Sequence, residues 1–421
     1  MQEEKKHLKT YQPEIALKEI SIKNFRGFTD FKVALDPKLN VVIGENGSGK
    51  TALLDSVAKV LSGVVQVSYE EATDIKKLFD ISDIKYDSSI FSLHMNLFFG
   101  NKKIECHVHF DKKLYPKIKI SGFDKQILSD IRKQSNLPLI AYYPTAYAPI
   151  DRIGFKGVGE SGPQDISELY DDLLPEKHFD FDSFFSWYKW QGNIRSQLGE
   201  NKTLDSVGEA ICGILSDDKN RFEKLIVNWL YNPNGELFIQ KNGMPLNTNQ
   251  LSSGEKTLLV LAADLARRLA IANPHRENPL EGHGIVLIDE VDLHLHPGWQ
   301  RRIIPQLQKT FPNCQLIVST HSPLVLSGIR PENIVMLSDF NLVEKLPNTF
   351  GKDTNFIQYE AMGVKQRPED IQAQIDKIYE LMDEQENLEA AKKALRELSK
   401  DLGENDSEIL KAYTHIHFME D

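Results

Sequence analysis

Residues 39–58 read LNVVIGENGSGKTALLDSVA, and this stretch decides the fold. The apolar run at 39–43 predicts a buried strand, and the residues from Ala52 onward are typical of a helix. Between them, residues 44–51 satisfy the pattern G-x-x-x-x-G-K-[ST] at every fixed position. A strand, a glycine-rich loop and a helix in this order predict a phosphate-binding loop, because backbone N–H groups and the helix N-terminus then face the same anion.

The side chains of this loop predict ATP with Mg²⁺ as its ligand. Lys50 is expected to reach the β- and γ-phosphates, and the Thr51 hydroxyl is expected to bind Mg²⁺. The competing interpretation is a glycine-rich turn that merely precedes a helix, and the fit of both flanks disfavours it. The predicted nucleotide-binding residues here are Gly44, Glu45, Asn46, Gly47, Ser48, Gly49, Lys50, Thr51 and Ala52.

A second segment, residues 285–290, reads IVLIDE. The apolar residues predict a buried parallel strand that brings two carboxylates to its C-terminal end, where open α/β sheets bind ligands. Asp289 is expected to hold the Mg²⁺ shell, and Glu290 is expected to orient or deprotonate the attacking water. An acidic pair after a strand can also be a helix cap, but the phosphate-binding loop upstream favours the catalytic interpretation.

A third segment, LSSGEK at 251–256, precedes apolar residues at helical spacing. It resembles the signature motif of ABC-type ATPases, with Ser253 where the first of two signature glycines usually lies and Glu255 at the glutamine position. The resemblance implies that this loop clamps the nucleotide bound to the opposite subunit of a homodimer or higher homo-oligomer. The residues implied are Ser252, Ser253, Gly254 and Glu255.

Two later segments follow the order of the same family. Residues 292–297 resemble its D-loop, and the apolar strand at 315–320 ends in His321, which resembles its switch histidine. No counterpart of the family's Q-loop glutamine is found. The catalytic residues implied are Lys50, Asp289, Glu290 and His321, and the metal ligands are Thr51 and Asp289.

The start of the domain narrows the subgroup. Residues 20–28 read ISIKNFRGF, and a strand followed by Asn-Phe-Arg resembles the DNA-associated ABC ATPases, which implies that Arg26 contacts the nucleotide. The runs at 290–297 and 319–323 resemble the overcoming-lysogenization-defect group. Residues 138–145, PLIAYYPT, resemble a segment of the ATPase subunits of Septu-type antiphage systems (PtuA), which also occur beside retrons.

These segments together predict an α/β fold, an ABC-type P-loop ATPase head with a mixed sheet core and an antiparallel β subdomain. We expect an N-terminal lobe at 14–150, a helical lid at 151–245, a C-terminal lobe at 246–360, and a helical segment at 368–421. Apolar stripes in the helical segment predict packing against its own domain or, alternatively, oligomerisation or partner docking.

The predicted lid has two notable features. An aromatic-dense run from Phe179 to Trp190 is interpreted either as core or as a partner surface, and residues Phe222, Leu225, Ile226 and Trp229 follow helical spacing. Turn signals at 232–235 and 241–243 predict a short hairpin just before the signature segment.

Composition limits the class of protein. The 421 residues are 41% hydrophobic, with no apolar stretch long enough for a membrane span and no signal-peptide pattern at the start, so we expect a cytoplasmic protein. The net charge of −11 argues against coating DNA with the whole surface. A basic stretch at 101–134 is either a local contact for DNA phosphates or an ordinary solvated strand face; its cations are Lys102, Lys103, Lys112, Lys113, Lys117, Lys119, Lys125, Arg132 and Lys133.

Cysteine and histidine usage predicts no additional metal site. The three cysteines are too scattered for a metal cluster or a disulfide framework. Histidine pairs occur at 107/109, 294/296 and 415/417, but no acidic or cysteine partner is spaced to complete a site, and His294 and His296 are expected to organise the dimer interface.

Two features of related ATPases have no counterpart in this sequence, and this affects the predicted function. The segment between Thr51 and Leu251 is too short for the coiled coils of chromosome-structure proteins, and the residues beyond Asn355 lack the pattern of a nuclease domain. We therefore expect an ATP-driven dimer switch that controls a separate nuclease, HNH-type by the Septu resemblance, acting on DNA in antiviral defence. The alternative is a DNA repair or recombination ABC ATPase without a nuclease partner.

Overall fold

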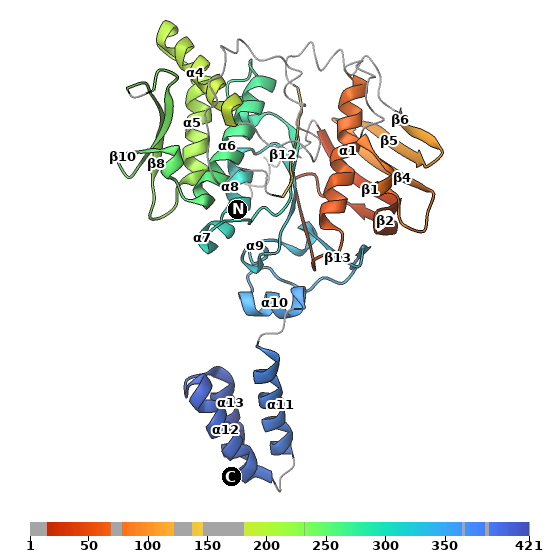
Figure 1. The fold of residues 1–421 in the computed structure, drawn as a ribbon, viewed down its shortest axis with the longest axis vertical. Helices are drawn as coiled ribbons and strands as arrows, with labels where there is room; N and C mark the ends of the chain where they lie inside the picture. The colour runs from red at the N-terminus through yellow and green to blue at the C-terminus, as the bar shows by residue number, and fades with distance from the viewer. Residues whose placement is uncertain are drawn as a thin grey trace, which may run out of the picture. The chain divides into compact units, whose positions relative to one another are not determined.

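The computed structural model describes residues 15–68, 78–121, 137–145, 181–230, 232–363, 367–383 and 387–420. The chain divides into two compact units, Met1–Lys352 and Asp353–Asp421 (Figure 1). Most of the first half of the predicted lid, including Phe179, lies outside the described residues. The same holds for the side chains of Lys117, Lys125, Arg132 and Lys133 in the basic stretch.

The centre of the first unit is a six-stranded mixed sheet in the order β14-β13-β3-β12-β11-β7. Five strands are parallel, and β14 is antiparallel at one edge. Strands β7, β11 and β12 are buried along their whole length, as expected of parallel strands covered on both faces. The bounds are β3 Leu39–Gly44, β7 Leu139–Tyr143, β11 Gly284–Ile288, β12 Cys314–Ser319, β13 Ile334–Ser338 and β14 Asn341–Leu342, which confirms the three strands predicted from the motifs.

A five-stranded antiparallel sheet, in the order β2-β1-β4-β5-β6, forms the predicted β subdomain. Its strands alternate between buried and exposed residues, because one face packs on the core and the other faces solvent. The bounds are β1 Ile15–Phe25, β2 Phe28–Ala34, β4 Ile90–Phe99, β5 Lys102–Asp111 and β6 Leu114–Ser121.

Two long helices connect these layers. Helix α1 (Lys50–Ser68) contacts β3, β11 and β12 of the central sheet and β5 of the antiparallel sheet, and one hydrophobic core includes residues of both sheets and of α1. Helix α6 (Ser253–Ala272) is buried over most of its length and contacts β7. The helices α4 (Phe181–Leu198), α5 (Lys202–Leu215) and α8 (Ile303–Thr310) gather with α6, away from α1 (Figure 1).

The described part of the aromatic run is mainly core. Residues Phe181, Phe184, Phe185, Trp187 and Tyr188 of α4 are buried. The Phe184 ring lies 5.5 Å from Phe181 and 5.6 Å from Tyr188, measured between centroids. These contacts favour the core interpretation of the run.

The helix expected around Phe222 is wrong. Residues Phe222–Asn228 form strand β8, which pairs with β9 (Glu236–Lys241), and β9 forms the predicted hairpin with β10 (Met244–Asn247). The pairing register shifts between Phe222 and Leu225, so this irregular strand buries both residues at a spacing of three, which imitates helical periodicity. The turn uses Asn242 and Gly243, both at positive φ, as a tight hairpin requires.

The second unit is helical. After α10 (Thr354–Met362), the helices α11 (Glu369–Asp383), α12 (Leu388–Leu402) and α13 (Ser407–Glu420) share a core that contains Ile375, Met382, Leu395 and Ile409. The predicted apolar stripes therefore pack within this unit, and their role in oligomerisation stays a prediction. Among the helices of the described ranges, none is long and apolar enough to cross a membrane.

Candidate nucleotide-binding site

The loop between β3 and α1 is shaped by glycines. Gly44 and Gly49 have φ values of 150° and 105°. A Cβ atom on Gly44 would lie 2.2 Å from the Leu337 carbonyl oxygen, and one on Gly49 would lie 2.6 Å from the Phe340 ring. The close approach of Leu337 and Phe340 therefore requires glycine at both positions, and the loop can keep its backbone open toward an anion.

The interior of this loop presents hydrogen-bond donors. The Lys50 ammonium donates to the Gly44 and Glu45 carbonyl oxygens at 3.0 and 2.9 Å. The Ser48 hydroxyl is buried and has no hydrogen-bond partner among the described residues. A buried hydroxyl without a partner costs about 1–3 kcal/mol, which a phosphate oxygen would offset, so the residues present fit a bound nucleotide phosphate.

Lys50 shares its surroundings with two carboxylates. Burial lowers the pKa of Lys50 below its ordinary value, and the nearby Asp289 and Glu290 oppose that shift. The ammonium is thus partly desolvated next to negative charge. Bound phosphate would add the counter-charge that a desolvated ammonium needs.

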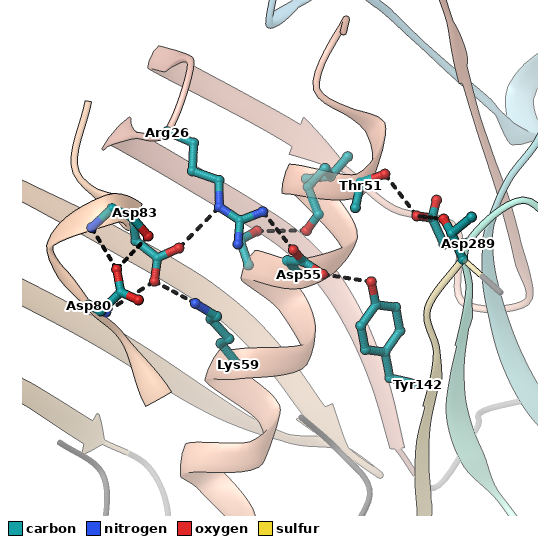
Figure 2. Close-up of polar contacts among 12 residues, drawn as sticks. Arg26, Thr51, Asp55, Lys59, Asp80, Asp83, Tyr142 and Asp289 are labelled. Atoms are coloured by element: carbon teal, nitrogen blue, oxygen red, sulfur yellow. Dashed lines mark hydrogen bonds and ion pairs between the residues drawn. The ribbon is translucent and has the colours of Figure 1, made fainter. Parts of the chain in front are cut away.

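Asp289, at the C-terminal end of β11, accepts hydrogen bonds from three hydroxyl groups. The Thr51 hydroxyl donates to Asp289 Oδ2 at 2.8 Å (Figure 2). The Thr145 hydroxyl donates to the same oxygen at 2.7 Å, and the Ser319 hydroxyl donates to Oδ1. Thr51 and Asp289 are therefore close enough to bind one Mg²⁺ together, as oxygen ligands suit that ion. Sequence reasoning missed Thr145, although the 138–145 segment ends there.

Glu290 stands in a strained backbone position beside this cluster. Its φ is 51°, in the left-handed region, and its N–H donates to the Ser319 hydroxyl at 2.7 Å. Such a conformation costs roughly 1–3 kcal/mol and persists only where the surroundings impose it. The Glu290 side chain is half-buried, whereas the Asp289 side chain is buried.

His321 belongs to the same electrostatic environment. Burial, then the charge of Lys50, lowers the pKa of His321, while Glu290, Asp292 and Asp289 oppose the shift. The structure therefore brings the four residues predicted to be catalytic into one unit, at the edge where β3, β11 and β12 end. Their catalytic roles stay predictions.

Arg26 lies in an ion-pair network that sequence reasoning did not foresee. Its guanidinium contacts Asp55 Oδ2 at 2.6 Å and Asp83 Oδ1 at 3.0 Å (Figure 2). Lys59 contacts Asp83 as well, at 2.5 Å, and the Tyr142 hydroxyl donates to Asp55 at 2.6 Å. Arg26 thus ties the end of β1 to α1, directly behind the phosphate-binding loop, and its predicted nucleotide contact stays a prediction.

The signature segment caps α6. The Ser252 hydroxyl and N–H both donate to Glu255 Oε2 at 2.8 Å, and Lys241 contacts Glu255 Oε1 at 2.6 Å. Both carboxylate oxygens of Glu255 are therefore occupied within the subunit. Ser252 and Ser253 are exposed, and a Cβ on Gly254 would lie 2.7 Å from the His294 carbonyl oxygen. This packing against the predicted D-loop fixes the N-terminus of α6.

A buried carboxylate joins α6 to the strand that precedes Thr145. Asp264 accepts from the Tyr143 hydroxyl at 2.7 Å and from Arg268 Nε at 2.8 Å, and Arg267 contacts it at 3.1 Å. The two arginines hold the pKa of Asp264 below its ordinary value against the effect of burial, which raises it. Asp264 therefore ties α6 to β7.

The loop, the paired carboxylates and the mixed sheet define a P-loop ATPase. The family model described as "AAA domain, putative AbiEii toxin, Type IV TA system" matches residues 39–327, and the chain belongs to that family. The predicted fold class and the predicted enzyme class, ATPase, are confirmed.

Similar proteins cover nearly the whole chain. The "Retron Vc95 probable ATPase" of Vibrio cholerae serotype O1 biovar El Tor is 28% identical over 89% of this chain and 83% of its own length. The "Retron Ec83 probable ATPase" of Escherichia coli is 28% identical over 93% and 83%, respectively. The "Septu protein PtuA" of Bacillus thuringiensis is 22% identical over 96% and 94%. The predicted resemblance to Septu-type and retron-associated ATPases is confirmed.

Proposed function

We propose that this chain is the ATP-hydrolysing subunit of an antiviral defence complex, in which ATP-driven pairing of two copies controls a separate nuclease, of the HNH type, that acts on DNA. The cluster of Lys50, Thr51 and Asp289 at the sheet edge is the observation that carries ATP hydrolysis. The retron and Septu relatives, which align with most of the chain, support the defence role.

The chemistry rests on the residues of one phosphate-binding edge. Lys50 holds the phosphates, and Thr51 and Asp289 hold the metal. When bound, Mg²⁺ neutralises charge that develops on the phosphate oxygens. Glu290 orients the attacking water and accepts its proton, at a strained backbone position next to Asp289. We expect His321 to sense the γ-phosphate.

The N-terminus of α6, which carries the signature segment, gives a reason for two copies of the chain to pair. Ser252 and Ser253 are exposed at the N-terminus of a 20-residue helix, where the helix dipole favours an anion. We assign that anion to the γ-phosphate on a second copy. ATP would then join two copies, and hydrolysis would separate them.

A phage-challenge experiment tests the defence role. The chain and its neighbouring genes are expressed in a susceptible host, and plaque formation is compared for wild type, Lys50→Ala and Lys345→Ala, an exposed control outside the basic stretch. Lys50→Ala should abolish protection, whereas Lys345→Ala should retain it. Unchanged protection with Lys50→Ala would contradict the proposal, and loss of survival after DNA damage without any effect on phage would favour the repair alternative.

Control of a nuclease needs its own measurement. Any nuclease found encoded beside this chain is co-purified with it, and cleavage of DNA is followed with and without ATP. The rate should change on adding ATP to wild type and stay constant for Lys50→Ala. A DNA cleavage rate that is the same with and without ATP, for both wild type and Lys50→Ala, would show that the ATPase does not control the nuclease.

A further inference from the structure

Two histidines and a glutamate converge on the solvent face of the antiparallel sheet. His94 of β4 lies directly opposite His107 of β5, and Glu105 is two residues from His107 on the same face. The two imidazole rings stack with centroids 4.2 Å apart and an interplanar angle of 20°. One ligand atom from each of the three residues lies within 4.8 Å of the other two. The expectation that no acidic partner is spaced to complete a site around His107 is therefore wrong.

This cluster could not be predicted from the sequence because its three residues lie on two different strands. Cross-strand neighbours have Cβ atoms about 4.5–5.5 Å apart, although His94 and His107 are far apart along the chain. Glu105 and His107 share a face because side chains alternate along a strand. Only the pairing register of β4 and β5 brings the three together.

Two polar atoms on this face, His94 Nε2 and Asn96 Oδ1, are buried without a hydrogen-bond partner among the described residues. The orientation of the Asn96 amide is fixed, because its Nδ2 donates to Glu19 Oε1 at 3.0 Å. An unsatisfied buried acceptor costs about 1–3 kcal/mol, and a cation beside the lone pair would remove that cost.

The two carboxylate oxygens of Glu105 have different contacts. Lys103 contacts Glu105 Oε1 at 2.5 Å, while Oε2 faces His107 Nε2 at 3.9 Å. One carboxylate oxygen is thus left for a metal.

We propose that His94, Glu105 and His107 bind a divalent transition metal ion of the zinc class, with water in the fourth position. Imidazole ligands suit zinc, whereas Mg²⁺ takes oxygen ligands, so this ion differs from the one expected at Asp289. Ligand atoms about 2.1 Å from a tetrahedral zinc lie roughly 3.4 Å apart. To reach that geometry from 4.8 Å, the partly exposed Glu105 and His107 side chains must move closer by up to about 1.4 Å, and the His107 ring must also turn out of the stack so that its nitrogen lone pair points at the ion.

Cobalt binding tests the site directly. The purified full chain, with its affinity tag removed and no nucleotide present, is titrated with Co²⁺ and its visible absorption is recorded. Wild type should bind one equivalent with the strong absorption of four-coordinate Co²⁺, and Zn²⁺ should displace it. His94→Ala and His107→Ala should each weaken binding more than about 100-fold, since even outer-shell partners of a metal are worth 10–100-fold.

His109 supplies the matched control. It is an exposed imidazole on β5, two residues from His107 and on the same face, but it is outside the cluster. His109→Ala should leave the Co²⁺ affinity unchanged, and Zn²⁺ should raise the melting temperature of wild type and of His109→Ala but not of His94→Ala. The proposal would be overturned if wild type and His94→Ala gave the same Co²⁺ absorption spectrum. It would also be overturned if His109→Ala lost as much Co²⁺ affinity as His94→Ala. Neither readout depends on ATP hydrolysis.

Discussion

The phosphate-binding loop and the signature segment both lie at helix N-termini, yet they treat charge in opposite ways. Among the described residues, the Lys50 ammonium of the loop donates hydrogen bonds only to carbonyl oxygens, and the Ser48 hydroxyl has no partner. In the signature segment, the Glu255 carboxylate is fully engaged by Ser252 and Lys241. The phosphate-binding loop therefore has donors available for an anion, whereas the start of α6 is already capped and offers the exposed Ser252 and Ser253 and the helix dipole.

This difference assigns ATP binding to a single subunit and assigns the role of the signature helix to the dimer of two copies. A single copy holds the donors and the carboxylate that phosphate and Mg²⁺ need, so ATP affinity should be a property of one subunit. The charge of Glu255 in the signature helix is neutralised within the subunit by Lys241. The contribution of this helix should appear only when two copies meet, in the rate of hydrolysis and in the amount of dimer.

The largest effect is expected from Glu290→Gln. Losing the base should lower kcat by about 10²–10⁴-fold, while ATP binding survives because Lys50 and Thr51 are intact. ATP-bound dimers should then accumulate, which sedimentation velocity would detect with and without ATP. A variant that remains monomeric with saturating ATP would contradict the sandwich of two copies.

A smaller but still large effect is expected from Lys50→Ala. Removing a charged donor to the phosphates should weaken ATP affinity about 100-fold, since one or two charge-assisted hydrogen bonds of roughly 1.5–3 kcal/mol each are lost. Titration of the purified chain with a fluorescent ATP analogue measures this, with Lys113→Ala as the exposed control. Unchanged affinity would refute the role assigned to Lys50.

The phosphate-binding loop could be predicted because its information is local. Residues 44–51 carry their own strand, glycines and helix, and the structure has β3 and α1 in those places. The Arg26 network and Thr145 could not be predicted, since Asp83 and Asp289 reach them only through tertiary packing. A local sequence pattern predicts the backbone structure of its own segment. The partners of a buried charged side chain depend on the tertiary fold and cannot be predicted from such a pattern.

The error at β8 has the same origin. Phe222 and Leu225 are buried three residues apart because the strand is irregular between them, and a window of sequence cannot distinguish that from a helical turn. The Lys241–Glu255 contact follows from the sheet that this strand helps to form. Sequence similarity to the signature motif therefore singled out Glu255 but did not reveal that its carboxylate is already occupied.

Ser252→Ala should give a moderate effect that separates the two helix starts. Loss of the cap should lower the free energy of unfolding by about 1 kcal/mol. ATPase activity should fall while ATP affinity of the single copy stays constant. Asn201→Ala, which removes the cap of α5, is the matched control, because it should cost similar stability with little effect on ATPase activity. Parallel losses of ATPase activity in both variants would reduce Ser252 to a purely structural residue.

The smallest effect concerns His321 and pH. The pKa of His321 lies below 6.5 because of burial and Lys50, whereas the unfolded chain binds this proton near its ordinary value. Between these two pKa values the unfolded state holds more protons, so the free energy of unfolding should fall as pH drops through about 6.5. His321→Gln should flatten that dependence in urea titrations, and the exposed His275→Gln should not. ATP should narrow this window in wild type, because the phosphate charge favours the imidazolium and raises the folded-state pKa of His321 toward its ordinary value; an unchanged window would place His321 out of reach of the nucleotide.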